Sequence, residues 1–300
     1  YNGIKIRGKH GEPIPNNVVQ ELKEEIYSVT KIYDSNGKDS IFINPLSDYQ
    51  KHIYSFINKE NIKYPSLLIL DSLYGATQNT LKTIFKPLGI ETKIMHNIHN
   101  PNFGGLNPDP ILPNLNELRN EILFASNENY EGVIGFGYDG DGDRLGIIDE
   151  KGNFINPNTI FALLCYHLLK NKGYKGNIVK SLTTTNLINK IAENYNSSII
   201  ETPVGFKYIA EESLNNDFLI GGEESGGFTI QNHFADKDGI LTSLLIIDLI
   251  NTERRKLYEI VEDIEKSYGR YYNKRLDIEN NSEAEQRIIH KLKSEFKPEI

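Results

Sequence analysis

Short apolar runs alternate with helical patterns along most of this chain. Leu67–Leu70 is a run typical of a buried strand, and Gly75 separates it from the next segment. That segment has apolar residues at helical spacing, at Leu81, Ile84 and Phe85. A second strand pattern follows over Glu91–Met95. The order strand, helix, strand predicts an α/β unit with a largely parallel sheet.

The same alternation continues through the middle of the chain. Val133–Phe136 and Leu145–Asp149 are typical of strands, and the loop between them is rich in aspartate. Pro157–Lys170 has apolar residues at helical spacing and a proline at its start. A second round follows, and its predicted strands are Asn177–Ser181, Ser198–Glu201 and Phe218–Ile220. Helices are predicted over Thr185–Tyr195, after Gly205 as far as Glu211, and over about Gly239–Leu257. The two rounds resemble each other in plan.

The pattern divides the chain near residues 40, 152 and 265. We expect an α/β fold with two complete three-layer α/β domains, 41–152 and 153–265, each with a mixed, mainly parallel sheet. Residues 1–40 and 266–300 are expected to be partial flanking domains. Tyr1–Ile6 already resembles a turn and a strand, and the chain from Tyr271 resembles the opening of a further domain. We therefore expect both ends to belong to a longer polypeptide.

Composition narrows the possible functions. The 300 residues include 33 Lys and Arg against 41 Asp and Glu, a net charge of −8, so no global positive charge favours nucleic acid or an anionic membrane. The apolar runs are far shorter than the ~20 residues that cross a bilayer. Cys165 is the one cysteine, which excludes an internal disulfide framework and a Cys-rich zinc site. We expect a cytoplasmic protein without nucleic-acid or membrane partners.

A loop of alternating aspartate and glycine is the most informative segment. Asp139, Asp141 and Asp143 follow a predicted strand, and the glycines between them let the backbone turn tightly enough for the carboxylates to converge. Converging carboxylates repel each other unless a cation lies between them. Their oxygen ligands favour Mg²⁺, Ca²⁺ or Mn²⁺ over zinc. Arg144, the next residue, offers a fork of donors for a phosphate.

Three other interpretations of this loop are weaker. A calcium EF-hand needs glycine where Arg144 stands, and helices where the flanking segments resemble strands. A phosphatase with an aspartyl nucleophile matches Asp139-Gly-Asp141 in outline, but Asp143 replaces the Thr or Val that usually follows. A solvated acidic turn does not explain why five consecutive Asp and Gly residues precede an arginine.

A second loop combines glutamate with glycine. Gly221–Gly227 follows a predicted strand and holds Glu223, Glu224 and Ser225 between its glycines. Glutamate accepts paired hydrogen bonds from vicinal hydroxyls, the arrangement that a sugar presents, and a serine hydroxyl can donate or accept. Alone, this loop is typical of a flexible surface turn. Together with the acidic loop it predicts a sugar site.

Weaker signals lie in other loops. Thr202–Lys207 joins a predicted strand to a helix, where backbone N–H groups suit an anion, and Lys207 is either an added charge or an ordinary exposed lysine. Lys5 alternates with apolar neighbours, as on the open face of a strand. His96 and His99 have no third His or Cys nearby, so we expect surface or substrate-loop residues rather than metal ligands.

These motifs together resemble the α-D-phosphohexomutases, the superfamily of phosphoglucomutase and phosphomannomutase. Asp139–Arg144 resembles the magnesium loop of the family, and Gly222–Gly226 resembles its sugar-binding loop. Supporting segments are Asp71–Ala76, Asn107–Pro110, Thr202–Lys207 and Lys237–Gly239. The resemblance runs nearly end to end. It implies four domains around a central cleft, of which this chain has the last part of domain one, domains two and three, and the start of domain four.

The resemblance also implies a reaction. Family members move phosphate between C1 and C6 of a hexose, through a phosphoserine and a hexose 1,6-bisphosphate that turns round in the site. It implies that Asp139, Asp141 and Asp143 bind Mg²⁺, which neutralises charge during phosphoryl transfer. It implies catalytic roles for Arg144, which orients the phosphate, and for Lys5, which takes part in proton transfer at a sugar hydroxyl. The implied substrate-binding residues are Glu223, Ser225, Thr202, Gly205 and Lys207.

The chain departs from the family pattern in three places. The phosphoserine of the family lies in a Ser-His-Asn-Pro type loop just before the segment that here begins at Tyr1. The phosphate-binding loop of domain four would lie beyond Ile300. Phe206 stands where some members have a histidine. We therefore expect these residues alone to bind metal poorly and to turn over no substrate.

The sequence thus predicts the central part of a Mg²⁺-dependent phosphohexomutase that is a monomer or a homodimer. Phe206 and the Glu-Glu-Ser-Gly-Gly segment favour glucose or mannose phosphates over glucosamine phosphate. Two other classes stay open. One is a non-catalytic module that binds a sugar phosphate or a metal, which would need a natural chain ending near these termini. The other is a phosphatase with Asp139 as nucleophile.

Overall fold

The computed structural model describes residues 5–30, 41–128, 130–215, 217–273 and 282–295. The chain divides into two compact units, and the boundary in the sequence lies between Arg270 and Tyr271. In the second unit, helix α10 spans Ser282–Glu295. Residues 1–4 and 274–281 lie outside the described residues. They include most of the strand predicted within Tyr1–Ile6 and part of the segment from Tyr271 that is expected to open a further domain. Lys5 and Ile6 are irregular, not strand.

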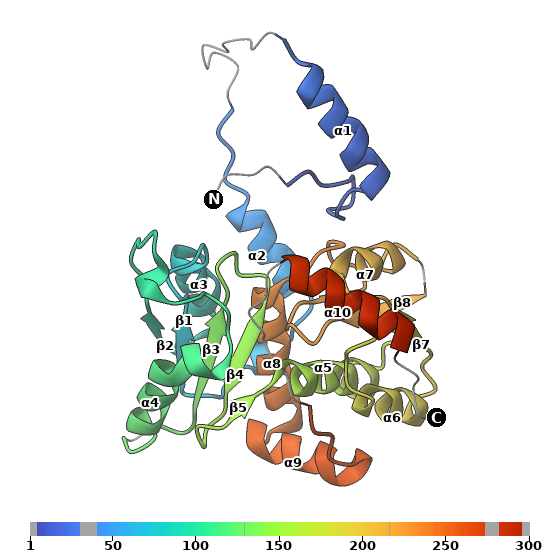
Figure 1. The fold of residues 1–300 in the computed structure, drawn as a ribbon. Coiled ribbons are helices and arrows are strands. Elements are labelled where there is room, and N and C mark those ends of the chain that lie inside the picture. The colour runs from blue at the N-terminus through green and yellow to red at the C-terminus, as the bar shows by residue number, and fades with distance from the viewer. Residues whose placement is uncertain (1–4, 31–40, 129, 216, 274–281, 296–300) are drawn as a thin grey trace. The chain divides into compact units, whose positions relative to one another are not determined.

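The first sheet has five strands in the order β2-β1-β3-β4-β5 (Figure 1). The strands are β1 (Leu67–Asp71), β2 (Glu91–Met95), β3 (Val133–Tyr138), β4 (Leu145–Ile148) and β5 (Phe154–Ile155). Strand β1 pairs in parallel with β2 and β3, and β4 and β5 continue antiparallel. Side chains of β1 alternate between the faces, so Leu68 and Leu70 enter one hydrophobic cluster and Leu67 and Ile69 another.

The second sheet repeats this order with four strands, β7-β6-β8-β9. The strands are β6 (Asn177–Ser181), β7 (Ile199–Thr202), β8 (Phe218–Gly222) and β9 (Phe228–Ile230). Strand β6 pairs in parallel with β7 and β8, and β9 is antiparallel to β8. The structure therefore confirms the predicted α/β class, and both rounds of the chain form a sheet with the strand order second, first, third, fourth.

Helices cover both faces of each sheet. The α-helices of the first unit are α1 (Asn16–Ser28), α2 (Leu46–Tyr54), α3 (Gln78–Phe85), α4 (Asn116–Ala125), α5 (Pro157–Tyr166), α6 (Leu187–Asn194), α7 (Phe206–Glu212), α8 (Gly239–Glu253) and α9 (Leu257–Tyr268). Shorter 3₁₀ helices are η1 (Lys59–Asn61), η2 (Lys86–Leu88), η3 (Phe103–Gly105) and η4 (Leu112–Leu115), and η5 (His167–Asn171) is a π-helical turn. Helix α4 packs on the outer face of the first sheet, and α7 packs on the outer face of the second.

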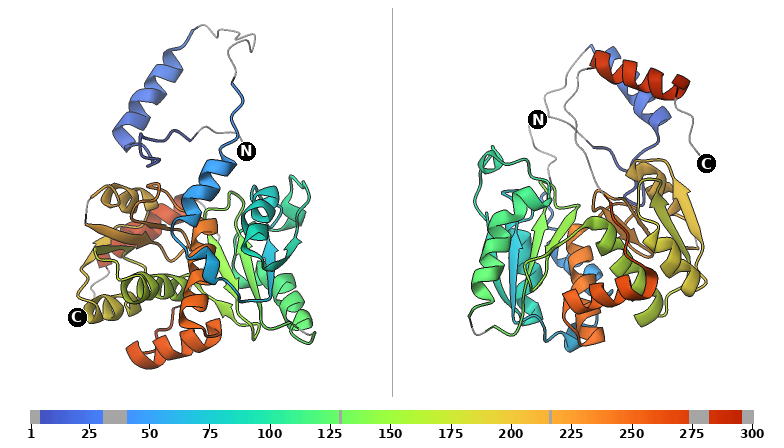
Figure 2. Two further views of the ribbon diagram at one scale, coloured as in Figure 1. Left: turned by 180° about the vertical axis from the view of Figure 1, so that it is seen from behind. Right: turned by 60° about the horizontal axis from the view of Figure 1, so that its bottom comes forward.

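Helix α8 lies in the core that the two sheets share. It contacts β4 of the first sheet and β9 of the second, and Figure 2 shows it (orange) between the two sheets. Every residue from Gly239 to Ile250 is buried, as expected for a helix that is apolar on all sides. No helix among the described residues combines the length and the apolar character needed to cross a membrane.

The predicted helix over Gly239–Leu257 is two helices in the structure. Helix α8 ends at Glu253, and Arg254 adopts the left-handed conformation with φ 54° and ψ 41°. Helix α9 then begins at Leu257. The apolar pattern continues across the junction, so the sequence did not show the break; a left-handed residue is usually glycine, and here it is arginine.

Candidate active site

Each sheet carries one of the two predicted loops at the same position. The acidic loop follows β3, and the glycine–glutamate loop follows β8; each is the third strand of its sheet. In both sheets the first strand lies between the second and the third, so the connections diverge to opposite sides at the carboxyl ends. Ligands bind outside such switch points in open α/β sheets.

The acidic loop turns tightly enough for its three carboxylates to converge. One oxygen each of Asp139, Asp141 and Asp143 lies within 4.8 Å of the other two. The Gly142 N–H donates to the Asp139 carbonyl at 3.1 Å, and Gly142 has a φ of 80°, in the region that favours glycine. The structure therefore brings together the three carboxylates that the sequence singled out.

Arg144 is held by two carboxylates. Its Nε donates to Asp139 Oδ2 at 2.8 Å, and its backbone N–H donates to Asp139 Oδ1 at 3.0 Å. Its guanidinium also donates to Asp109 Oδ1 at 2.9 Å. Asp109 lies in the supporting segment Asn107–Pro110 and is buried. These bonds fix the plane of the guanidinium, as recognition of a phosphate requires.

The other two carboxylates each meet a lysine from a distant segment. Lys5 Nζ lies 3.1 Å from Asp141 Oδ2, and Lys237 Nζ lies 2.8 Å from Asp143 Oδ2. The hydrogen bond to Asp141 raises the pKa of Lys5, so its ammonium stays charged. Burial acts to raise the pKa of Asp141, but the Lys5 ammonium lowers it on balance.

The donor set fits a hard divalent cation. Burial, and next the Asp143 charge, raise the pKa of Asp139 to about 6. Asp143 Oδ1 is buried and accepts no hydrogen bond from any described residue. A buried carboxylate oxygen without a donor is costly unless a cation binds it. Carboxylate oxygens alone favour Mg²⁺ or Mn²⁺ over zinc.

Two neighbouring segments hold the backbone of the acidic loop. The Ala76 N–H donates to the Gly140 carbonyl at 2.9 Å, and the Gly239 N–H donates to the Gly142 carbonyl at 3.2 Å. A Cβ atom on Gly75 would lie 2.7 Å from the Gly140 carbonyl oxygen, and one on Gly239 would lie 2.7 Å from the Gly142 carbonyl oxygen. Neither glycine position accepts a side chain without moving the loop.

The glycine–glutamate loop presents a fixed carboxylate. Glu223 is buried, and its Oε1 accepts a hydrogen bond from the Gly205 N–H at 2.9 Å. The Gly226 N–H donates to the Glu223 carbonyl at 3.1 Å and closes the turn. Burial raises the pKa of Glu223, although the Gly205 N–H opposes this. Gly205 and Glu223, predicted separately as substrate-binding residues, are therefore in direct contact.

The other side chains of this loop differ in their partners. Glu224 Oε2 accepts hydrogen bonds from Ser181 Oγ at 2.9 Å and Thr183 Oγ1 at 2.5 Å, so this carboxylate is bound to the loop after β6. The half-buried Ser225 hydroxyl has no hydrogen-bond partner in the described part of the chain, which leaves it available to a ligand.

The two predicted loops contact each other. Arg144 and Gly227 form an isolated antiparallel bridge, and the Leu145 N–H donates to the Gly226 carbonyl at 3.2 Å. Lys237 lies at this junction, because its aliphatic chain fills the space where Gly227 lacks a side chain. One lysine thus contacts both the acidic loop and the glycine–glutamate loop.

Thr202 and Lys207 are the remaining predicted substrate-binding residues, and their contacts are with residues outside the acidic loop. Thr202 is buried at the end of β7, with its Oγ1 3.5 Å from the Lys180 carbonyl. Lys207 is exposed, and its Nζ lies 4.8 Å from the centre of the Tyr208 ring. No carboxylate among the described residues pairs with Lys207.

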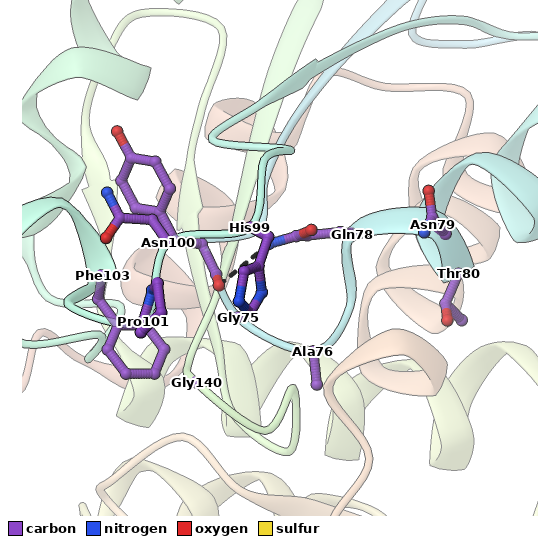
Figure 3. Close-up of a pocket in the computed structure, with 11 residues that line it drawn as sticks. Gly75, Ala76, Gln78, Asn79, Thr80, His99, Asn100, Pro101, Phe103 and Gly140 are labelled. Carbon is purple, nitrogen blue, oxygen red and sulfur yellow. Dashed lines mark hydrogen bonds between the residues drawn. The ribbon is translucent and has the colours of Figure 1, made fainter.

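Two cavities adjoin the acidic loop. One of about 280 Å³ is lined by Thr77, Asp141, Asp143 and Lys237, among others. The other, of about 560 Å³, lies between the loop after β1 and the segment at 99–103 (Figure 3). His99 faces this second cavity. The dashed line in Figure 3 is the 3.1 Å hydrogen bond from the Gln78 amide to the Tyr74 carbonyl, which closes one wall.

His96 does not lie in this cavity. Its Nδ1 lies 2.7 Å from Asp71 Oδ1, and its Nε2 lies 3.0 Å from Glu117 Oε2. The hydrogen bond with Asp71, which is fully buried, raises the pKa of His96. This histidine therefore connects the buried Asp71 at the end of β1 to Glu117 of α4, a structural role that the sequence did not reveal.

Two family models match consecutive stretches of the chain. "Phosphoglucomutase/phosphomannomutase, alpha/beta/alpha domain II" matches residues 47–152, and "domain III" of the same description matches residues 156–268. Together they include both loops and every strand of the two sheets except β5. The chain belongs to the phosphoglucomutase/phosphomannomutase family. The predicted superfamily is thereby confirmed.

Two relatives and one solved structure of this family each have 28% sequence identity with the chain. A phosphoglucosamine mutase of Dictyoglomus thermophilum is 28% identical over 272 residues, which are 88% of this chain and 57% of that protein. A phosphoglucomutase/phosphomannomutase of Thermococcus kodakarensis is 28% identical over 274 residues, 89% of this chain and 58% of that protein. The crystal structure of a putative phosphomannomutase from Thermus thermophilus matches with a TM-score of 0.76 and 28% identity, covering 87% of this chain and 58% of that one. The chain thus spans less than two thirds of the length of these family members.

The sequence missed two residues of the site. Lys237 and Asp109 lie in the supporting segments Lys237–Gly239 and Asn107–Pro110, but nothing in the sequence singles them out as site residues. Their contacts with Asp143 and Arg144 span 94 and 35 positions in the chain. No local pattern predicts such pairs; a lysine and an aspartate beside glycine or proline are common in any loop.

Proposed function

We propose that this chain supplies the metal loop and the sugar loop of a Mg²⁺-dependent phosphohexomutase. The enzyme would interconvert hexose 1-phosphate and hexose 6-phosphate through a hexose 1,6-bisphosphate. The observation that carries this proposal is the direct contact of the two loops, through the bridge between Arg144 and Gly227. This contact places groups suited to a phosphate beside groups suited to sugar hydroxyls.

We assign the metal to the acidic loop. Asp139, Asp141 and Asp143 would each hold Mg²⁺ through one carboxylate oxygen. Bound there, the ion would neutralise charge on the transferring phosphate. The buried oxygen of Asp143 without a donor supports this assignment.

Two basic residues would act on the reacting groups. Arg144, with its guanidinium plane fixed by Asp109 and Asp139, would orient a phosphate through its remaining N–H donors. Lys5 would hold a proton on Nζ beside Asp141 and donate it toward the sugar oxygen that loses its phosphate. Its hydrogen bond to Asp141 keeps it in the protonated form that this role requires.

The sugar would bind on the glycine–glutamate loop. The Glu223 carboxylate would accept hydrogen bonds from two neighbouring hydroxyls, and the Ser225 hydroxyl would complete the contact. Thr202, Gly205 and Lys207 would lie toward the second phosphate. Relatives at 28% identity are named for glucosamine and for glucose or mannose substrates, so the preference for glucose or mannose phosphates stays a prediction from Phe206 and the loop sequence.

A mutase assay with matched variants tests the proposal. In the complete gene product, Asp143→Asn and Glu223→Gln should each lower the turnover of glucose 1-phosphate by about 10²-fold or more, because each removes a charged contact that stabilises the transition state. The control Glu262→Gln, on α9 and paired only with exposed Lys151, should keep the rate. Mannose 1-phosphate and glucosamine 1-phosphate, assayed alongside, establish the substrate preference.

The same assay contains the contradicting outcomes. Unchanged rates in both loop variants would remove these loops from the reaction. Release of inorganic phosphate in place of the isomeric sugar phosphate would favour the phosphatase.

A further inference from the structure

A cavity of about 900 Å³ lies at the end of α8 that is remote from the acidic loop. Its walls are residues 58–64, residues 171–172 and residues 248–259, together with Glu131. Gly239, at the start of α8, contacts the acidic loop, and the 15 residues of the helix span about 22 Å at 1.5 Å per residue. The cavity is therefore separate from the site described above.

Asp248 is a buried residue of α8, and hydrogen bonds to its carboxylate attach two walls of the cavity to this helix. Asp248 Oδ1 accepts the Asn58 N–H at 2.9 Å. Asp248 Oδ2 lies 2.6 Å from Lys172 Nζ and 3.0 Å from His167 Nε2. These contacts hold the segment before β1 and the segment after α5 against the same turn of the helix.

Asn251, one turn further along, completes the attachment. Its Oδ1 accepts the N–H groups of Lys63 at 2.8 Å and Tyr64 at 3.0 Å, and its Nδ2 donates to the Tyr64 carbonyl at 2.7 Å. The cavity wall is thus built by internal hydrogen bonds. A preformed wall lowers the ordering cost that a ligand must overcome.

Basic residues outnumber acidic ones in the lining. The basic residues are Lys63, Lys172, Arg254, Arg255 and Lys256, and the acidic ones are Glu131, Asp248 and Glu259. Two of the five cations have protein partners, since Lys172 pairs with Asp248 and Arg255 pairs with Asp263. The side chains of the other three form no ion pair within the part of the chain that the structure describes.

These three unpaired cations come from two walls. Arg254 is held in the left-handed conformation, where glycine is the usual residue. Cations near a helix C-terminus complement the helix dipole, which accounts for a basic residue at 254. The dipole does not account for Lys63, which comes from the segment before β1, some 190 positions away in the chain. Positive charge converges here although the whole chain has a net charge of −8.

We propose that this cavity binds a small ligand with two phosphoryl groups. The guanidinium of Arg254 suits a phosphate through paired donors, and Lys63 and Lys256 add point charges from two different segments of the lining. The volume of about 900 Å³ lies within the range of small-molecule sites, about 300–1,000 Å³. Free diphosphate and an organic diphosphate share this chemistry.

Calorimetry with inorganic pyrophosphate tests the proposal. The titration is run in EDTA, without divalent cations, so that the acidic loop has no metal to attract the ligand. The wild-type protein should bind one equivalent, and both Arg254→Gly and the double variant Lys63→Ala/Lys256→Ala should bind at least tenfold more weakly. The control Lys82→Ala removes an exposed lysine of α3 outside the cavity and should bind as the wild type does.

The variants keep the result interpretable. Arg254→Gly relieves the left-handed backbone, so its thermal unfolding should be unchanged or shifted upward while binding is lost. A parallel titration with ADP distinguishes the sources: tighter binding than pyrophosphate indicates a nucleotide, and equal binding indicates the diphosphate group alone. No saturable binding of either ligand at millimolar concentration, or binding that Arg254→Gly leaves unchanged, would overturn the proposal.

Discussion

Gly75 and Gly239 approach the acidic loop from two segments that are 164 positions apart in the chain. Each lies so close to a loop carbonyl that a Cβ atom would be 2.7 Å from the oxygen. Such contact fixes the loop backbone, and the backbone directs the three carboxylates toward one point. At the residue scale, close approach by glycine is thus as important to the metal site as the aspartates.

Gly75→Ala tests this role. The added methyl group would meet the backbone of Asp139 and Gly140 rather than a flexible side chain, so we expect a loss of about 1–3 kcal/mol in the free energy of unfolding. Urea denaturation measures this loss. Ala76→Ser, an exposed neighbour, is the control and should change stability by less than about 0.5 kcal/mol. Equal stability of the two variants would show that the loop adapts without cost.

Residue types in a short motif could be predicted from the sequence, and their distant partners could not. The spacing of Asp139, Asp141 and Asp143 predicts that their carboxylates converge, because the glycines between them allow a tight turn. The pairing of Asp143 with Lys237 depends on where α8 begins relative to the first sheet. That position is a property of tertiary packing, which no local pattern encodes.

At the scale of elements, the N-terminus of α8 carries a polar network that connects several segments. Asp238 caps the helix, with its Oδ1 accepting the Leu241 N–H at 2.8 Å. The Tyr49 hydroxyl of α2 donates to the same carboxylate at 2.8 Å, and His233 Nε2 lies 3.1 Å from it. His52 Nε2 in turn lies 3.0 Å from His233 Nδ1. The cap thereby fixes the helix end that contacts the acidic loop.

Asp238→Ala should therefore cost more than the loss of an ordinary cap. Removing a cap costs about 0.5–2 kcal/mol, and here the buried groups of Tyr49 and His233 also lose their partner. Asn156→Ala, which removes the cap of α5 and its 3.1 Å bond to the Thr159 N–H, is the matched control. Thermal unfolding of both variants measures the difference. A cost for Asp238→Ala no greater than for Asn156→Ala would contradict the network.

Strands were predicted more reliably than helix boundaries. Leu67–Leu70 and Glu91–Met95 are short apolar or alternating runs, and turn-forming residues such as Pro65, Gly75 and Gly89 lie near their ends, so these ends are visible in the sequence. The end of α8 at Glu253 is not visible, because Arg254 replaces the glycine that usually marks such a stop. The π-helical turn at His167–Asn171 was missed for a similar reason: it places His167 against Asp248, a contact made 81 positions away.

At the scale of the whole first unit, two sheets of equal strand order share one hydrophobic core. That core includes β1 and β3 of the first sheet, β6 and β8 of the second, and helix α8 between them. The acidic loop and the glycine–glutamate loop, which follow the third strands of the two sheets, contact each other through the bridge between Arg144 and Gly227. The sequence predicts two rounds of one plan, but it gives neither the strand order within each sheet nor the contact between the loops, because both depend on tertiary packing.

The central claim is that the acidic loop holds a divalent cation beside a sugar on the glycine–glutamate loop. Crystals of the complete gene product, soaked with Mn²⁺ and glucose 1,6-bisphosphate, test this through the anomalous signal of the metal. We expect one strong peak about 2.1 Å from an oxygen each of Asp139, Asp141 and Asp143, with sugar hydroxyls on Glu223. An anomalous peak at other residues, or a saturated crystal with no peak at the three aspartates, would contradict it.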